Sequence, residues 1–130
     1  MIKAWVWIKS KDSEKEEEKM LTIDGLKELG AEVDEGLARC MNKEDFYLRL
    51  VGMALTDENF DSLHAAIEAG DLEKGFECAH ALKGMLGNVA LTNVLAPVLE
   101  MTEALRARED RDYTPLLEQM DAELAKIKAL

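Results

Sequence analysis

One histidine, one lysine and two glycines occur at helical spacing in the middle of the chain. The stretch reads Ala79-His80-Ala81-Leu82-Lys83-Gly84-Met85-Leu86-Gly87-Asn88-Val89-Ala90. At about 100° per residue, the histidine, the lysine and both glycines fall within an arc of roughly 100° on one helix face. The apolar residues centre on roughly the opposite side: Cys78, Leu82, Met85, Leu86 and Val89.

The residue types on this face indicate phosphoryl transfer. A neutral imidazole, here that of His80, is nucleophilic near pH 7 without a helper base. The Lys83 ammonium, one turn on, can neutralise charge that gathers on the oxygens of a transferring phosphoryl group. Gly84 and Gly87 each cost a helix about 1 kcal/mol relative to alanine. Such positions beside a reactive group usually admit the close approach of another molecule.

At these positions the chain resembles the histidine-containing phosphotransfer (HPt) domain family, whose motif reads H-x-L-K-G before a small-residue helical turn. The residues that match the motif directly are His80, Leu82, Lys83 and Gly84. Residues 88–91 are similar to the asparagine, aliphatic, glycine, apolar run that follows, with Ala90 where glycine is usual. Leu95 and Leu99-Glu100 resemble the leucines of the next family helix, and the resemblance covers roughly residues 21–108.

The resemblance implies a phosphocarrier without kinase activity in a two-component phosphorelay. His80 would accept a phosphoryl group from the aspartate of one response-regulator receiver domain and pass it to another, downstream of a hybrid histidine kinase. Lys83 would supply electrostatics and Gly84 room for the partner. The expected binding residues are Phe76, Gly87 and Asn88. Phe76 suits either a docking contact or a core position, and Asn88 suits a cap of the helix end or of the turn more than a phosphate contact.

Composition favours one all-helical domain. The chain has 130 residues, two prolines and 5% aromatics, enough for a single core. Its net charge is −11, and residues 1–19 hold five lysines and five acidic residues, so residues 20–130 carry the whole excess. A surface this acidic repels nucleic acid. The sequence contains no apolar run of 18 residues, so we expect no membrane span.

The boundaries and cysteines are typical of a small cytoplasmic domain. We expect residues 20–130 to form the HPt-like bundle and residues 1–19 to be an N-terminal extension outside the core. Cys40 and Cys78 lie far apart and in no metal or redox spacing, which favours a reduced protein with two small core residues. We expect a monomer.

Periodicity and capping residues predict a series of amphipathic helices. Gly30 closes a first helix, Asn42 caps a helix that runs to about Leu55, and Gly70 ends the next. The other expected segments are 33–40, a central helix capped by Asp71, a helix after Thr92, and a last one that Thr114 caps before Pro115. Pro97 predicts a kink or a later start in the helix after Thr92. We therefore expect an antiparallel up-and-down four-helix bundle with short additional N-terminal helices.

Two other functions compete with phosphotransfer. Asp61-x-x-His64 and Glu77-x-x-His80 are similar to the ligand pairs of a two-metal four-helix bundle. Further ligands for such a site would be Glu100, Glu103 or Glu118. Those ligands project into the bundle core, whereas His80 lies opposite the apolar stripe of its helix. The second alternative is a non-phosphorylated helical adaptor, against which the intact His80 and Lys83 count.

The motif lacks the parts needed for phosphorylation by the chain alone. No glycine-rich nucleotide loop and no acidic cluster accompany His80 in the sequence. We therefore expect no bound cofactor, and expect Mg²⁺ and the reacting carboxylate to belong to the partner receiver domain. His64 is expected to border the core.

Overall fold

The structure, a computed structural model, describes residues 21–130. The extension predicted for residues 1–19 lies outside the described residues. Every regular element described is an α-helix. The helices are α2 (Ile23–Glu28), α3 (Val33–Arg39), α4 (Glu44–Leu55), α5 (Asn59–Ala69), α6 (Leu72–Asn88), α7 (Thr92–Arg106) and α8 (Thr114–Lys128).

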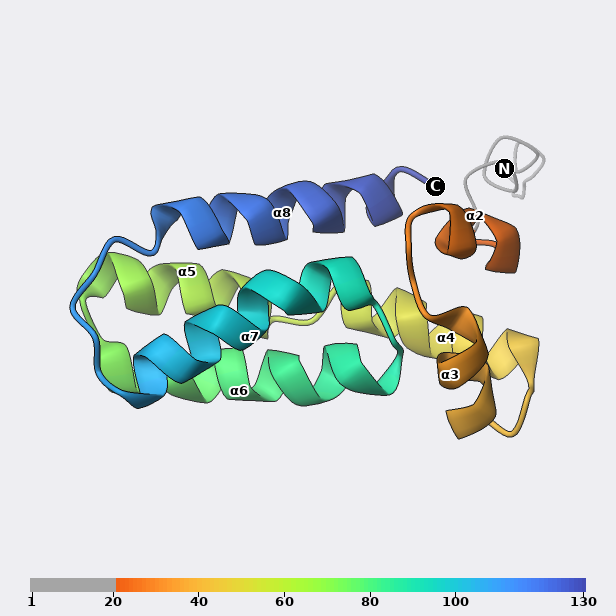
Figure 1. Cartoon of the computed structure of the whole chain (residues 1–130), viewed down its shortest axis with the longest axis horizontal. Coiled ribbons are helices and arrows are strands. Elements are labelled where there is room, and N and C mark those ends of the chain that lie inside the picture. The colour runs from red at the N-terminus through yellow and green to blue at the C-terminus, as the bar shows by residue number, and fades with distance from the viewer. Residues whose placement is uncertain (1–20) are drawn as a thin grey trace, which may run out of the picture.

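Helices α5 to α8 run side by side in alternating directions and form an antiparallel bundle (Figure 1). Helices α2 and α3 lie at the end of the bundle where α6 passes into α7, next to α4 (Figure 1). The predicted fold class, a helical bundle preceded by short helices, is confirmed. None of the described helices is both long and apolar enough to cross a membrane.

The bundle is held together by one apolar stripe from each helix. α6 buries Cys78, Ala79, Leu82 and Leu86 on the face opposite His80. α7 and α8 bury matching rows: Val94, Val98, Met101 and Leu105 on α7, and Leu116, Leu117, Met120, Leu124 and Ile127 on α8. Cys40 and Cys78 are both free and buried, as predicted. Burial of each large side chain stabilises the fold by about 1.5–3 kcal/mol, so this packing fixes the orientation of α6.

The two ends of α6 are closed as its sequence requires. Asp71 caps the N-terminus, its carboxylate accepting a 3.0 Å hydrogen bond from the backbone N–H of Lys74. At the other end Ala90 takes the left-handed conformation, with φ +58°. The N–H of Leu91 then donates to the carbonyl of Leu86 at 3.1 Å, which completes a Schellman turn. The turn therefore forms with alanine at a position where glycine is usual.

Of the two outcomes predicted at Pro97, a kink or a later start of the helix, the later start is wrong. α7 begins at Thr92 and runs through Pro97, which is buried inside it. Proline removes the hydrogen bond that the carbonyl of Asn93 would accept. Asn93 is exposed, so water can satisfy that carbonyl. The buried row of α7 lies on both sides of the proline and outweighs its cost.

Two predicted helix caps are also wrong. Asn42 lies outside α4 in the left-handed conformation, with φ +59°, and Lys43 precedes the helix without a side-chain cap. Asparagine tolerates this conformation, so Asn42 completes the connection from α3 instead. At α8 the cap position is Tyr113, and the carboxylate of Asp112 accepts the N–H of Thr114 at 2.9 Å. Pro115 remains in the first turn, as predicted.

Candidate functional site

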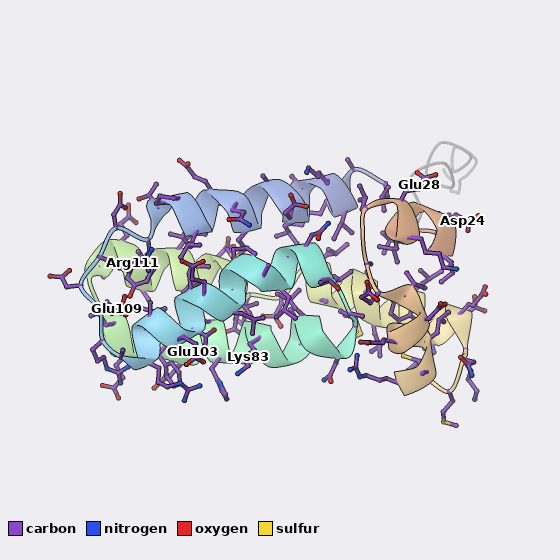
Figure 2. The ribbon with its side chains drawn as sticks, in the orientation of Figure 1. Asp24, Glu28, Lys83, Glu103, Glu109 and Arg111 are labelled. Carbon is purple, nitrogen blue, oxygen red and sulfur yellow. The ribbon has the colours of Figure 1, made fainter. Side chains whose placement is uncertain are left out.

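The face of α6 predicted to do chemistry is open to solvent. His80 and Gly84 are exposed, and Lys83 and Gly87 are half-buried at its edge. Behind them Leu82 and Leu86 are fully buried and anchor the helix. Figure 2 places Lys83 in the middle of α6, away from Glu109 and Arg111 at the connection between α7 and α8. The structure therefore brings together the four residues that the motif singled out.

The glycines of this face leave room that the protein itself does not fill. A Cβ atom added at Gly84 or Gly87 would meet nothing within 4 Å. Gly75 on the same helix differs, because a Cβ there would lie 3.4 Å from Leu105 and 3.5 Å from Ile67. Gly75 serves internal packing. Gly84 and Gly87 form an open strip beside His80 where another molecule can approach the helix backbone.

Phe76 lies one turn before His80 and packs against its ring. The two ring centroids are 5.5 Å apart with an interplanar angle of 25°. Phe76 is half-buried and also packs against the hydrophobic core. It therefore combines the two positions that the sequence left open, a core residue with one side on the site. Stacking of this kind restricts the imidazole to few orientations.

Two arginines from the end of α7 complete this stack. The guanidinium carbon of Arg106 lies 5.0 Å from the Phe76 ring centroid, and that of Arg108 lies 5.8 Å from it. Both distances are within cation–π range. Sequence analysis missed these arginines, because no local pattern reveals which part of α7 faces Phe76.

The C-terminal end of α6 is held by a clasp, made up of Glu32, Arg39 and Tyr47. The Arg39 guanidinium donates a 2.8 Å hydrogen bond to the carbonyl of Gly87, and the Tyr47 hydroxyl donates one of 2.8 Å to the carbonyl of Val89. The N–H of Glu32 donates to the carbonyl of Ala90 at 3.0 Å. These bonds tie α3, α4 and the segment before them to carbonyls at the end of α6 and in the turn that follows it.

Tyr47 is suited to this role by its surroundings. Burial, and secondarily the nearby Cys40, raise the pKa of Tyr47 to about 12, so the hydroxyl stays protonated and donates. Asn88, predicted to cap the helix or the turn, is instead the last residue of α6 and is exposed. The turn after it is closed by the backbone of Ala90. This leaves the Asn88 side chain at the edge of the open face.

His64, the other histidine, has a different environment. Its Nε2 lies 2.9 Å from Oδ2 of Asp121, an ion pair or hydrogen bond that joins α5 to α8. The pair borders an open pocket of about 260 Å³ between these helices. The remaining lining residues are Phe60, Asp61, Leu124, Ala125 and Lys128. His64 thus borders the core, as expected, and one of its ring nitrogens is occupied by a carboxylate.

The residues proposed for a two-metal site do not converge. Within residues 21–130, no group of three or more histidine, cysteine, aspartate or glutamate side chains is close enough to hold a metal ion. His80 is stacked on Phe76 and His64 is paired with Asp121. Glu103 lies 3.4 Å from Arg106. The geometry therefore gives the metal hypothesis no support.

Comparison with known protein families agrees with the site. Residues 53–130 match the Hpt domain family, and this range contains all of α5 to α8 and the whole His80 face. No curated protein and no solved structure matches the chain closely enough to add a relative. Hpt domains carry phosphoryl groups on histidine in phosphorelays, where they interact with receiver domains and histidine kinases, and they are not kinases themselves. On this match, which covers more than half of its length, the chain belongs to the Hpt domain family.

Proposed function

We propose that His80 is the phosphoacceptor of this Hpt domain. It takes a phosphoryl group from the aspartyl phosphate of one receiver domain and passes it to the aspartate of another. The observation that carries the proposal is an exposed imidazole next to two glycines on one helix face. A Cβ atom added at either glycine would meet nothing within 4 Å. The domain is residues 20–130, working as a cytoplasmic monomer downstream of a hybrid histidine kinase.

The reaction needs only a nucleophile from this chain. A ring nitrogen of His80 donates its lone pair to phosphorus, and the bond between phosphorus and the aspartate oxygen breaks. The electron pair of that bond leaves with the carboxylate, so an acyl phosphate becomes a phosphoramidate and a free carboxylate. The return step, to a second receiver, is the same exchange in reverse, and no water or nucleotide takes part.

The other site residues act on charge and access. Lys83 lies one turn from His80 on the same face, where its ammonium can offset negative charge on the equatorial oxygens of the transition state. Gly84 and Gly87 allow loops of the receiver to reach within bonding distance of the imidazole. Asn88 borders the place where those loops would lie. Mg²⁺, held by the receiver, would supply further charge neutralisation at the phosphoryl group.

Positioning comes from the two supports of α6. The core packing of Leu82 and Leu86 fixes the rotation of the helix, and the clasp fixes its far end. Phe76 limits the orientations of the ring. A nucleophile held in this way loses little further entropy when the partner docks, which is the main contribution that a phosphocarrier can make.

The test is phosphotransfer with a matched pair of histidine variants. A panel of purified receiver domains is charged with acetyl phosphate and Mg²⁺, freed of reagent by gel filtration and mixed with the protein. We expect wild type and His64→Gln to gain an acid-labile, alkali-stable phosphate, and His80→Gln to gain none while keeping its helical circular dichroism. Retained phosphate on His80→Gln would overturn the assignment. Failure of the wild type with every receiver would favour the adaptor hypothesis instead.

A further inference from the structure

The protein as a whole repels anions, yet its proposed substrate is anionic. The net charge is −11, and the whole excess of acidic residues lies in residues 20–130. A receiver that carries an aspartyl phosphate brings a further doubly charged group. At physiological ionic strength such charges interact over about 8 Å. The receiver can therefore approach productively only where positive charge lies close to His80. Lys83 contributes a single positive charge there.

Phe76 gathers two more cations at this place. The Phe76 ring stacks on His80, and the guanidinium groups of Arg106 and Arg108 lie over the same ring. Arg106 is the last residue of α7, and Arg108 has the left-handed conformation with φ +57°. An Arg108 Nη1–H also donates a 2.8 Å hydrogen bond to the carbonyl of Leu105. Contacts with the ring and, for Arg108, with the backbone therefore hold both cations at the aromatic ring that stacks on His80.

Nearby carboxylates neutralise little of the positive charge of Arg106 and Arg108. Among the described residues Arg108 forms no ion pair, and Arg106 contacts a single carboxylate, Glu103, at 3.4 Å. Arg111 provides a contrast from the same connection. It lies over the Tyr113 ring at 5.7 Å, but two carboxylates, Glu100 and Glu109, lie 3.7 Å from its guanidinium.

We propose that Arg106 and Arg108, seated on Phe76, form a docking element for the anionic surface that surrounds the phosphoaspartate of the partner. This inference rests on the proposed function, since it assigns a partner chemistry to the His80 site. The two arginines act on association and choice of partner, because rim charges mainly change the association rate and its salt dependence. Phe76 is a positioning residue, because its ring contacts both guanidinium groups and also stacks on the imidazole of His80.

The experiment measures the second-order rate constant of phosphotransfer from a charged receiver at low salt and at about 0.5 M salt, where the Debye length is about 4 Å. At low salt we expect the Arg106→Ala/Arg108→Ala variant to be about fivefold slower and the double glutamate variant roughly 30-fold slower. At high salt the differences should shrink to about twofold. Arg111→Ala, the matched control, should behave as wild type at both salt concentrations.

Variants of Phe76 test the positioning role separately. Phe76→Leu removes the aromatic face and should lose part of the salt-dependent rate, whereas Phe76→Tyr keeps the face and should restore it. A purely structural role for Phe76 would change thermal stability but would not change the slope of rate against salt concentration.

The possible failures can be told apart. If His80→Gln still becomes phosphorylated, the proposed function itself is wrong. If His80 is the acceptor but the double alanine variant transfers at the wild-type rate at low salt, the docking element is wrong and the proposed function stands. Equal losses in Arg111→Ala and the double variant would also overturn the inference, because the effect would then follow net charge and not position.

Discussion

The open face of α6 and the clasp that holds the C-terminal end of this helix are built in opposite ways. On the open face, an added Cβ at Gly84 or Gly87 would meet no other atom within 4 Å. In the clasp, buried Tyr47 fills the space next to Gly36 so closely that a Cβ there would collide with the tyrosine ring. The open face leaves room for a partner molecule, whereas the region of the clasp is filled by contacts within the protein.

This difference predicts that rate and stability respond to different residues. Changes on the open face should slow phosphotransfer with little effect on the free energy of unfolding, because they break no internal contact. Changes in the clasp should lower the free energy of unfolding. The transfer rate of the folded molecules should stay nearly unchanged, because the buried Leu82 and Leu86 still hold α6 behind His80.

The largest expected effect is on transfer after Gly84→Leu. The side chain extends into open space, so the fold tolerates it, but it occupies the place proposed for the partner. We expect a loss of about 100-fold in the transfer rate, since small misplacements of reacting groups have effects of this size. Gly52 on α4 is the matched control, because a Cβ there also meets nothing within 4 Å. Gly52→Leu should transfer normally, and an equal loss there would remove the distinction.

Lys83→Ala should have the next largest effect. Loss of one charge that stabilises the transition state is expected to cost at least about tenfold in single-turnover rate. Lys83→Arg should recover part of the loss, because it restores the charge but not the compact ammonium. Lys74→Ala, an exposed lysine on the same helix, controls for net charge. Rapid-quench kinetics at saturating receiver separate this effect from weaker docking.

Tyr47→Phe tests the clasp. The substitution leaves the buried carbonyl of Val89 without its 2.8 Å hydrogen bond, which should cost about 1–3 kcal/mol in the free energy of unfolding. Urea titration followed by circular dichroism measures this cost, while the transfer rate below the transition should change less than about twofold. A large loss of rate in the folded variant would show that the clasp also tunes the site. Tyr113→Phe, which loses a less buried bond to Glu109, should be milder.

The same tyrosine also predicts an alkaline loss of stability. The pKa of Tyr47 is about 12 in the folded protein, because burial and then Cys40 raise it from an ordinary 10.0. The unfolded chain therefore loses this proton first. The contribution of Tyr47 is complete below pH 10 and declines as the pH rises from 10 to 12, by about 2 kcal/mol in total.

Comparison with Tyr47→Phe isolates that contribution. The variant should lose less stability over this pH range than the wild type does. Tyr113, whose pKa burial also raises, is present in both proteins and cancels. Parallel pH profiles for the two proteins would contradict the assignment.

Local sequence signals were sufficient for most of the helices and for the placement of His80, Lys83 and the two glycines on one open face. Asp71 and Gly70 mark helix ends through interactions with their own neighbours, and the face of His80 follows from helical spacing alone. The errors arose where a distant contact decided the outcome. Pro97 is accepted inside α7 because buried residues on both sides of it pack against α6 and α8, a stabilisation that no local rule contains.

The supports of the site could not be predicted for the same reason. Arg39 and Tyr47 bind carbonyls 48 and 42 residues further along the chain. Phe76 was singled out from its spacing to His80, but Arg106 and Arg108 reach its ring only because of how α7 crosses α6. A motif specifies which residues react, whereas tertiary packing specifies which residues hold and surround them.

The most direct test of the central claim is to locate the phosphoryl group after transfer from a charged receiver. Intact-mass measurement and peptide fragmentation under alkaline conditions, which preserve phosphoramidates, give both the number of groups and their position. We predict a single phosphoryl group on His80 and none on His64. A phosphoryl group on His64 or on any other residue, with His80 unmodified, would contradict the account.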